Sequence, residues 1–257
     1  MKVVIFCGGL GTRLREETEF RPKPMVPVGD RPILWHIMKT YAHFGHKEFI
    51  LCLGYKGEAI KDYFRNYQWY TSDVTLQLGA RPRIQYHTRH DEEDWVVTMV
   101  DTGQNTQTGG RLKRVLPYVK DDTFLLTYGD GVTDSDINAS IAFHRRMKRI
   151  VTITAVHPTG RFGDIDIENK VVTSFREKPE RSSGFINGGF FVLNKKIGDY
   201  LTGDACVFEQ EPLNRLAADR QIAAYVHTGF WQCMDTYREQ QLLTTLWNSG
   251  KAPWKIW

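Results

Sequence analysis

The chain lacks any apolar run of the roughly 20 residues that a membrane-spanning helix needs. Its opening segment, residues 1–7, is too short for the apolar region of a signal peptide and runs directly into glycines. We therefore expect a cytoplasmic protein without a membrane partner.

Cysteine is scarce, and no metal-binding histidine motif is present. The four cysteines, Cys7, Cys52, Cys206 and Cys233, lie far apart with no paired spacing, which argues against a disulfide framework and against a zinc site. The eight histidines include no HExxH pattern. We expect reduced thiols and histidines that serve in packing or on the surface.

No long block of like charge appears either. The formal net charge is +4, with both signs spread along the chain. The densest basic segments, 111–114 and 145–149, are short and are typical of solvated helix faces. We therefore expect no nucleic-acid partner.

What the sequence does contain is an alternation of short apolar runs and helical patterns. Residues 2–7, 49–53, 123–128 and 151–156 read as buried strands. One helix is predicted from Asp30 and Pro32 to Gly45, and another begins at Asp134 or Asp136. This rhythm predicts an α/β fold with a doubly wound, mostly parallel, Rossmann-like sheet.

The second half departs from that rhythm. Residues 160–193 show short alternating strands with glycine turns, which predicts a small antiparallel hairpin addition, and the last third returns to helices. No repeat, low-complexity segment or linker is visible, so residues 1–257 should form one domain.

A glycine-rich loop, "FCGGLGTRL", follows the first predicted strand. Glycines at this point allow positive φ and let backbone N–H groups approach an anion, and Arg13 adds a phosphate ligand. The loop is no dinucleotide fingerprint, because Leu14 stands where the last glycine belongs, and it lacks the Gly-Lys-Ser/Thr of a P-loop. A plain tight turn is the alternative.

Lys23 lies between Pro22 and Pro24, which stiffen the backbone that carries its ammonium group. The strand, the GGxGTR loop and this Pro-Lys-Pro segment together resemble the sugar-phosphate nucleotidyltransferases. The segments "GRLKRV", "TYGDGV", "SFREKPE", "INGGFFV", "GFWQCMDT" and "GKAPWK" look most like the glucose-1-phosphate cytidylyltransferases, and the resemblance covers essentially the whole chain.

The resemblance implies a reaction between CTP and α-D-glucose 1-phosphate that gives CDP-glucose and pyrophosphate with Mg²⁺. The product would feed the synthesis of dideoxysugars, as in the O-antigen of lipopolysaccharide. No general base is required, because a phosphate monoester with a second pKa of about 6 is already mostly dianionic at pH 7. Positioned cations should supply the catalysis.

The resemblance also assigns roles to individual residues. Asp130 and Asp235 match the two carboxylates for Mg²⁺, although each alone reads as a turn residue or a helix cap. Arg13 and Lys23 match the cations that act on the phosphates. The implied nucleotide contacts are Gly8, Gly9, Leu10, Gly11, Thr12, Arg13, Lys23, Thr106, Gly110, Arg111 and Asp130. The implied sugar-phosphate contacts are Glu177, Lys178, Asn187 and Gly188. Residues 1–156 would mainly bind the nucleotide, and residues 157–257 the sugar phosphate.

Three other functions remain open. The same chemistry could use another acceptor or another nucleotide, the scaffold could be a non-catalytic sensor, or the chain could be a dinucleotide-dependent oxidoreductase. The retained charged residues disfavour the sensor, and the missing third glycine disfavours the oxidoreductase. The resemblance further suggests a homo-oligomer, a trimer or hexamer, to which the aromatic C-terminal segment could contribute contacts.

Overall fold

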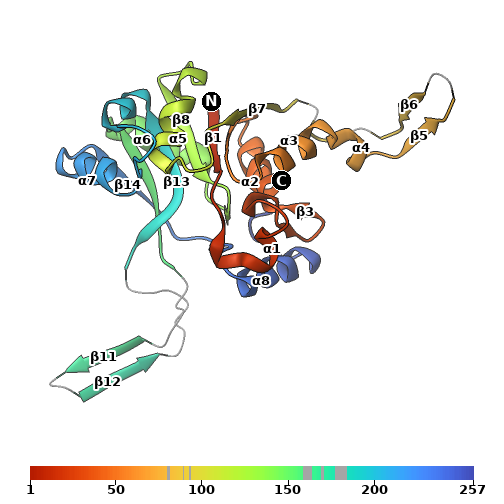
Figure 1. The fold of residues 1–257 in the computed structure, drawn as a ribbon. Helices are drawn as coiled ribbons and strands as arrows, with labels where there is room; N and C mark the ends of the chain where they lie inside the picture. The colour runs from red at the N-terminus through yellow and green to blue at the C-terminus, as the bar shows by residue number, and fades with distance from the viewer. Residues whose placement is uncertain (80–81, 89, 93, 159–163, 169–170, 177–183) are drawn as a thin grey trace.

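The structure is a computed structural model that describes residues 1–79, 82–88, 90–92, 94–158, 164–168, 171–176 and 184–257. For residues 164–168 and 171–176 it describes the backbone. Figure 1 shows a central body of sheet and helices from which two hairpins project.

A seven-stranded sheet forms the centre of the body. Its strands, in spatial order, are β14 (Ile222–His227), β10 (Val151–Val156), β13 (Ile186–Asn194), β8 (Thr123–Tyr128), β1 (Lys2–Cys7), β4 (Glu48–Leu53) and β7 (Val96–Asp101). Every neighbouring pair is parallel except those that include β13, which runs antiparallel to β10 and β8. The four predicted strands and the mostly parallel sheet are confirmed.

Helices bury both faces of this sheet. Along β1, Val3 and Ile5 belong to one apolar cluster and Val4 and Phe6 to the other, because alternate side chains of a strand point to opposite faces. The first cluster includes residues of α2 (Ile33–His43), α3 (Gly57–Arg65), α6 (Ile137–Met147) and α8 (Tyr237–Asn248). The second includes residues of α5 (Thr108–Val115) and α7 (Glu211–Ala218). The doubly wound architecture is confirmed.

Both predicted helices are present, but Asp30 does not cap the first one, since its carboxylate accepts a hydrogen bond from Nε1 of Trp247 at 2.9 Å. Helix α2 follows Pro32 and ends shortly before Gly45, whose φ is +84°. Asp136 caps α6, since its side chain accepts a hydrogen bond from the Ala139 amide at 2.8 Å. Asp134 has a different use, because it accepts a hydrogen bond from the Phe230 amide at 2.7 Å.

Two antiparallel hairpins extend the body. One joins β11 (Asp164–Glu168) to β12 (Val171–Arg176), as predicted. The last part of the region predicted as a small addition, residues 186–193, belongs instead to β13 of the central sheet. The other consists of β5 (Val74–Gln77) and β6 (Arg83–Tyr86), carried on α4 (Tyr67–Thr71), and the sequence patterns gave no sign of it. We call residues 67–79 and 82–88 the arm; Figure 1 shows it reaching away from the sheet beyond α3.

Short elements complete the fold. Two further ladders pair β2 (Pro27–Val28) with β3 (Arg31–Pro32) and β9 (Gly131–Thr133) with β15 (Trp231–Cys233). The remaining helical turns are η1 (Thr12–Leu14), α1 (Arg15–Thr18), η2 (Lys23–Met25), η3 (Leu116–Tyr118) and η4 (Lys195–Tyr200). In the part of the chain that is described, no helix is both long and apolar enough to cross a membrane.

The C-terminal aromatic residues pack inside their own chain. Trp254 is 0% exposed, stacks near Phe230 and Trp247, and donates from Nε1 to Nδ1 of His36 at 3.4 Å. Burial lowers the pKa of His36 to about 4, so this ring is neutral at pH 7 and Nδ1 can accept. The segment closes the core around α2 and α8.

Replacing Trp254 by alanine should therefore destabilise the fold. We expect the Trp254→Ala variant to lose about 3–5 kcal/mol of unfolding free energy, because a large buried ring leaves a cavity. Denaturant unfolding followed by circular dichroism measures the change. Phe20→Ala, at a largely exposed ring, is the control, and equal losses in the two variants would contradict a core role for Trp254.

Candidate active site

A short antiparallel ladder brings together two aspartates that lie far apart in sequence. Asp130 stands between β8 and β9, and Asp235 follows β15. Gly131 of β9 faces Cys233 of β15, and the Met234 amide donates to the Asp130 carbonyl at 2.8 Å. Both carboxylates therefore lie at the carboxyl edge of β8, where ligands bind in open parallel sheets.

Lys23 joins the two carboxylates. Its Nζ lies 2.6 Å from Oδ2 of Asp130 and 2.7 Å from Oδ1 of Asp235. The other oxygen of Asp235 accepts from Arg13 at 2.6 Å. Burial opposes the charge of Lys23, but the two carboxylates outweigh it and raise the pKa of the ammonium above its usual value. Lys23 is therefore charged at pH 7.

Two glycines of the glycine-rich loop pack closely against neighbouring side chains. Gly11 has φ +65°, and a Cβ there would lie 2.6 Å from Cγ2 of Thr18. A Cβ on Gly8 would lie 2.2 Å from the guanidinium of Arg111, whereas Gly9 has nothing within 4 Å of that position. Gly8 and Gly11 therefore serve the packing of the loop, and Gly9 presents open backbone.

Arg111 supports this loop from behind. Its Nη1 donates to the Leu53 carbonyl at 2.9 Å and to Oγ1 of Thr102 at 2.7 Å. Its Nη2 donates to the carbonyls of Gly8 at 3.0 Å and Gln104 at 3.2 Å. The nucleotide contact expected of Arg111 stays a prediction, but the structure gives its charge a second use, which is to tie three loops together.

Gly110 also serves packing. It lies buried in α5, where a Cβ would come 2.7 Å from Cα of Asp204. Thr106, the other residue predicted near the base, is 7% exposed. Leu10 is exposed, and Thr12 opens η1.

Two hollows meet at Asp130. The first, of about 200 Å³, is lined by the glycine loop, Lys23, Thr106 and Thr108, and we call it the loop pocket. The second, of about 340 Å³, is lined by Arg13, Asn187, Gly188, Trp231 and Asp235, and we call it the acceptor pocket. Tyr128 and Asp130 line both.

The structure brings most of the predicted site residues to these hollows. Asn187 and Gly188 lie at the start of β13, and the Trp231 indole donates to the Gly188 carbonyl at 2.6 Å. Glu177 and Lys178 lie outside the described residues, so their sugar-phosphate role stays a prediction.

Sequence patterns missed Tyr128 and Glu209. The Tyr128 hydroxyl donates to Oε1 of Glu209, and Oγ1 of Thr108 donates to Oε2 of the same carboxylate at 2.6 Å. Burial and the adjacent carboxylate raise the pKa of Tyr128, so its hydroxyl keeps the proton. The "TYGDGV" segment placed Tyr128 next to Asp130, but no pattern marked Glu209, which reaches the site only through the fold.

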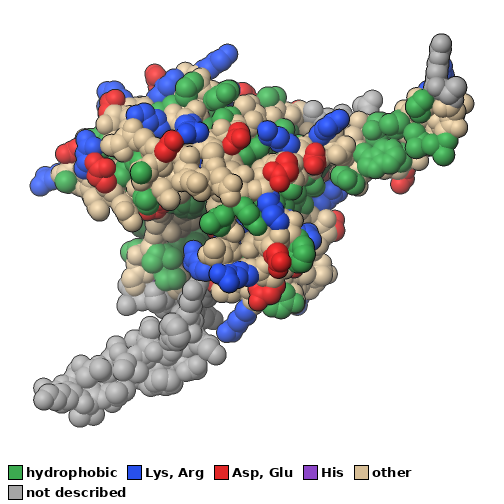
Figure 2. All heavy atoms as spheres, viewed as in Figure 1, with side chains coloured by type: hydrophobic (Ala, Val, Ile, Leu, Met, Phe, Trp, Pro, Cys, Tyr) green, Lys and Arg blue, Asp and Glu red, His purple; other side chains and the backbone are tan. Residues whose placement is uncertain are grey.

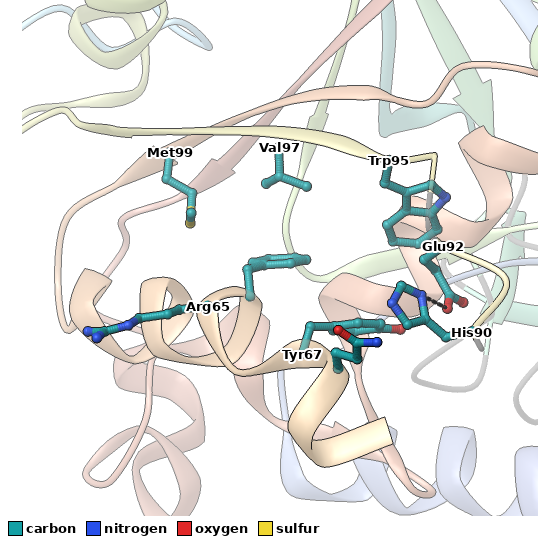
Figure 3. A pocket seen from close by; sticks show the side chains of 9 residues that line it. Arg65, Tyr67, His90, Glu92, Trp95, Val97 and Met99 are labelled. Atoms are coloured by element: carbon teal, nitrogen blue, oxygen red, sulfur yellow. Dashed lines mark ion pairs between the residues drawn. The ribbon is translucent and has the colours of Figure 1, made fainter. Parts of the chain in front are cut away.

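A larger hollow of about 560 Å³ lies elsewhere among the described residues. Figure 3 shows Val97 and Met99 of β7, with Trp95 just before that strand, pointing toward the helices that carry Arg65 and Tyr67; the Arg65 side chain points away. Its lining is mostly aromatic and aliphatic and offers no group of cations for phosphates. Chemistry rather than size therefore selects the aspartate site.

The residues present at the aspartates suit magnesium. Mg²⁺ prefers hard oxygen ligands and keeps several waters or phosphate oxygens, so two carboxylates suffice. Among the described residues, no cluster of three or more His, Cys, Asp or Glu side chains forms a self-sufficient metal site. A cation held here would take its other ligands from water and substrate.

Comparison with known proteins agrees with this geometry. The family model described as nucleotidyl transferase matches residues 2–232. The chain is 55% identical to the glucose-1-phosphate cytidylyltransferase of Salmonella typhi and 43% identical to a probable enzyme of that name from Bacillus subtilis, each match covering 100% of both chains.

Solved structures show the same fold at lower identity. HddC from Yersinia pseudotuberculosis matches with a TM-score of 0.68 and 24% identity, over 96% of this chain and 99% of that one. A UDP-glucose pyrophosphorylase complexed with UDP-glucose matches with a TM-score of 0.69 and 14% identity, over 97% and 98%. The family match and the full-length identities show that the chain belongs to the nucleotidyl transferase family.

Proposed function

We propose that this chain transfers a cytidylyl group from CTP to α-D-glucose 1-phosphate, releasing CDP-glucose and pyrophosphate. The observation that carries the proposal is the meeting of Lys23, Arg13, Asp130 and Asp235 at the junction of two hollows. The relatives at 55% and 43% identity over their full length carry the name of this activity. The product would then feed the synthesis of dideoxysugars for surface polysaccharides such as O-antigen.

The chemistry is an in-line displacement at phosphorus. A phosphate oxygen of the sugar phosphate forms a bond to the α-phosphorus of CTP, and the bond to the β-phosphate oxygen breaks as pyrophosphate leaves. The site contributes positive charge where several anions must crowd together. Asp130 and Asp235 would hold a Mg²⁺ ion, which supplies charge neutralisation when bound.

The chain's own residues position the two substrates. The open backbone at Gly9 faces the loop pocket, where N–H groups suit the phosphates of the triphosphate. Arg13 lines the acceptor pocket and is mostly exposed. Its guanidinium can therefore pair with pyrophosphate as that anion leaves. Asn187, Gly188 and Glu209 supply polar groups for the sugar, and Glu177 and Lys178 are proposed to complete that contact.

One alternative keeps the mechanism and changes a substrate. A relative from Campylobacter jejuni, 32% identical over 82% of this chain, is named a D-glycero-alpha-D-manno-heptose 1-phosphate guanylyltransferase. Both the base and the acceptor therefore vary within the family. Full-length identity favours the cytidylyl and glucose pair for this chain.

We further propose that the protein is a homo-oligomer, a trimer or hexamer, in which the arm of one copy packs against another copy. The arm exposes Tyr70, Leu76, Leu78 and Ile84, and Leu78 is 87% exposed. Figure 2 shows hydrophobic side chains gathered along the projecting arm. A lone two-stranded hairpin is marginally stable in water, so a partner surface would explain it. The C-terminal aromatics, in contrast, are used inside their own chain.

The preferred pair of substrates can be identified by assaying every combination of nucleoside triphosphate and sugar 1-phosphate. We expect four nucleoside triphosphates tested against several sugar 1-phosphates to give the highest kcat/KM for CTP with glucose 1-phosphate. Product mass identifies each nucleotide sugar. A higher value for another pair would replace the proposed substrates and leave the chemistry in place.

Removing either carboxylate charge should abolish most turnover. We expect Asp130→Asn and Asp235→Asn each to lower kcat roughly a hundredfold or more, because the site loses a cation ligand. Pyrophosphate release measures the rate, and thermal unfolding checks the fold. Asp94→Asn, at an exposed aspartate paired with Lys47, should leave kcat unchanged; wild-type rates in both site variants would refute the assignment.

A charge on the arm should dissociate the assembly. We expect Leu78→Glu to lower the molar mass in solution toward that of the 29.7 kDa chain, measured by size exclusion with light scattering. Met147→Glu, at an exposed residue of α6, is the control. An unchanged mass for Leu78→Glu, or a wild-type protein that is monomeric, would contradict the arm contact.

A further inference from the structure

We propose that Lys23 and the divalent cation compete for Asp130 and Asp235, so that the lysine must leave the carboxylates before the cation binds and is thereby released toward the phosphates. This rests on the proposed function, in which these two aspartates hold the metal. Lys23 is then both a substrate ligand and an internal competitor of the metal.

The geometry places one cation between the two carboxylates. Nζ of Lys23 lies 2.6 Å from an oxygen of Asp130 and 2.7 Å from an oxygen of Asp235. A metal that takes the same two oxygens cannot leave the ammonium between them, because like charges at such separations repel strongly. One of the two cations must move.

Burial strengthens the ion pair between Lys23 and the carboxylates, with which an entering metal ion must compete. The side chain of Lys23 is 12% exposed and that of Asp235 is 14% exposed. Water therefore screens this ion pair much less than it screens an exposed one. An entering metal must replace an interaction that is strong in this setting, and its apparent affinity falls accordingly.

The ammonium group of Lys23 has an alternative position in the loop pocket. A Cβ on Gly11 would lie 3.3 Å from Cβ of Lys23, so the stem of the lysine runs beside the glycine loop. Lys23 also lines the loop pocket. Its four-carbon stem is flexible, whereas Pro22 and Pro24 hold the backbone, so the ammonium can swing toward the loop pocket while its Cα stays in place.

Charge balance favours an exchange of partners. The cluster pairs the two positive charges of Arg13 and Lys23 with the two negative charges of Asp130 and Asp235. When a divalent cation takes the carboxylates, both side chains need other anions, and the phosphates of a triphosphate supply them. Metal and nucleotide should therefore bind cooperatively, with Lys23 linking the two events.

The test is a metal titration without substrate. Mn²⁺, a paramagnetic stand-in for Mg²⁺, is titrated into the full-length protein, and the free ion is counted by electron paramagnetic resonance. We expect Lys23→Met to bind Mn²⁺ roughly ten- to a hundredfold more tightly than the wild type, because a like charge leaves the site. Turnover in the same variant should fall, so that affinity and activity move in opposite directions.

The matched control is Lys47→Met. It removes a lysine that pairs with Asp94 on the surface at 2.5 Å, and it should leave Mn²⁺ affinity within about twofold. Lys23→Gln repeats the test with a polar side chain if the methionine variant is unstable in thermal unfolding. Unchanged or weaker Mn²⁺ binding in a folded Lys23 variant overturns the proposal, because a lysine that only positions the carboxylates would help the metal.

Two further variants separate this inference from the proposed function. In the Lys23→Met background, Asp130→Asn or Asp235→Asn should abolish the gain in Mn²⁺ affinity. If the gain survives both, the metal does not bind at these aspartates, and the proposed metal site fails together with this inference. If the aspartate variants of the wild type lose Mn²⁺ while Lys23→Met gains nothing, only the competition fails.

Discussion

The pairing of β9 with β15 is the constraint on which the site depends. It sets Met234 against the Asp130 carbonyl and so fixes the two carboxylates at one point of the carboxyl edge. Lys23 and Arg13 can neutralise them only because that ladder holds the aspartates together. Without it, the two carboxylates would lie in separate turns, Asp130 between two glycines and Asp235 just before Thr236, the residue that caps α8.

Positive charge has two separate uses around this point. Lys23 and Arg13 pair with carboxylates at the surface of the two hollows, where substrate phosphates can compete for them. Arg111 instead donates hydrogen bonds from its guanidinium to backbone carbonyls behind the glycine loop. Two cations that face the hollows, backed by a third that is bound to the backbone, suit a reaction in which anions must enter, exchange a bond and leave.

Much of the fold could be predicted because it depends on short-range patterns. The apolar runs at β1, β4, β8 and β10 alternate with helices, and Asp136 and Gly45 mark helix ends by local hydrogen bonding and φ. The arm escaped prediction because β5 and β6 expose most of their residues, so they lack the clean alternation that a half-buried strand shows. The parallel pairing of β7 with β4 likewise depends on partners distant in sequence.

The sequence by itself determined the chemistry available at the site: a glycine loop, a proline-bracketed lysine and two aspartates in segments that resemble a known family. Only the tertiary structure decided how these groups meet. It placed Lys23 between the aspartates, turned Arg111 to the backbone and brought Glu209 against Tyr128 and Thr108. The physical reason is that such contacts join residues far apart along the chain, and their partners are chosen by packing and burial rather than by any local pattern.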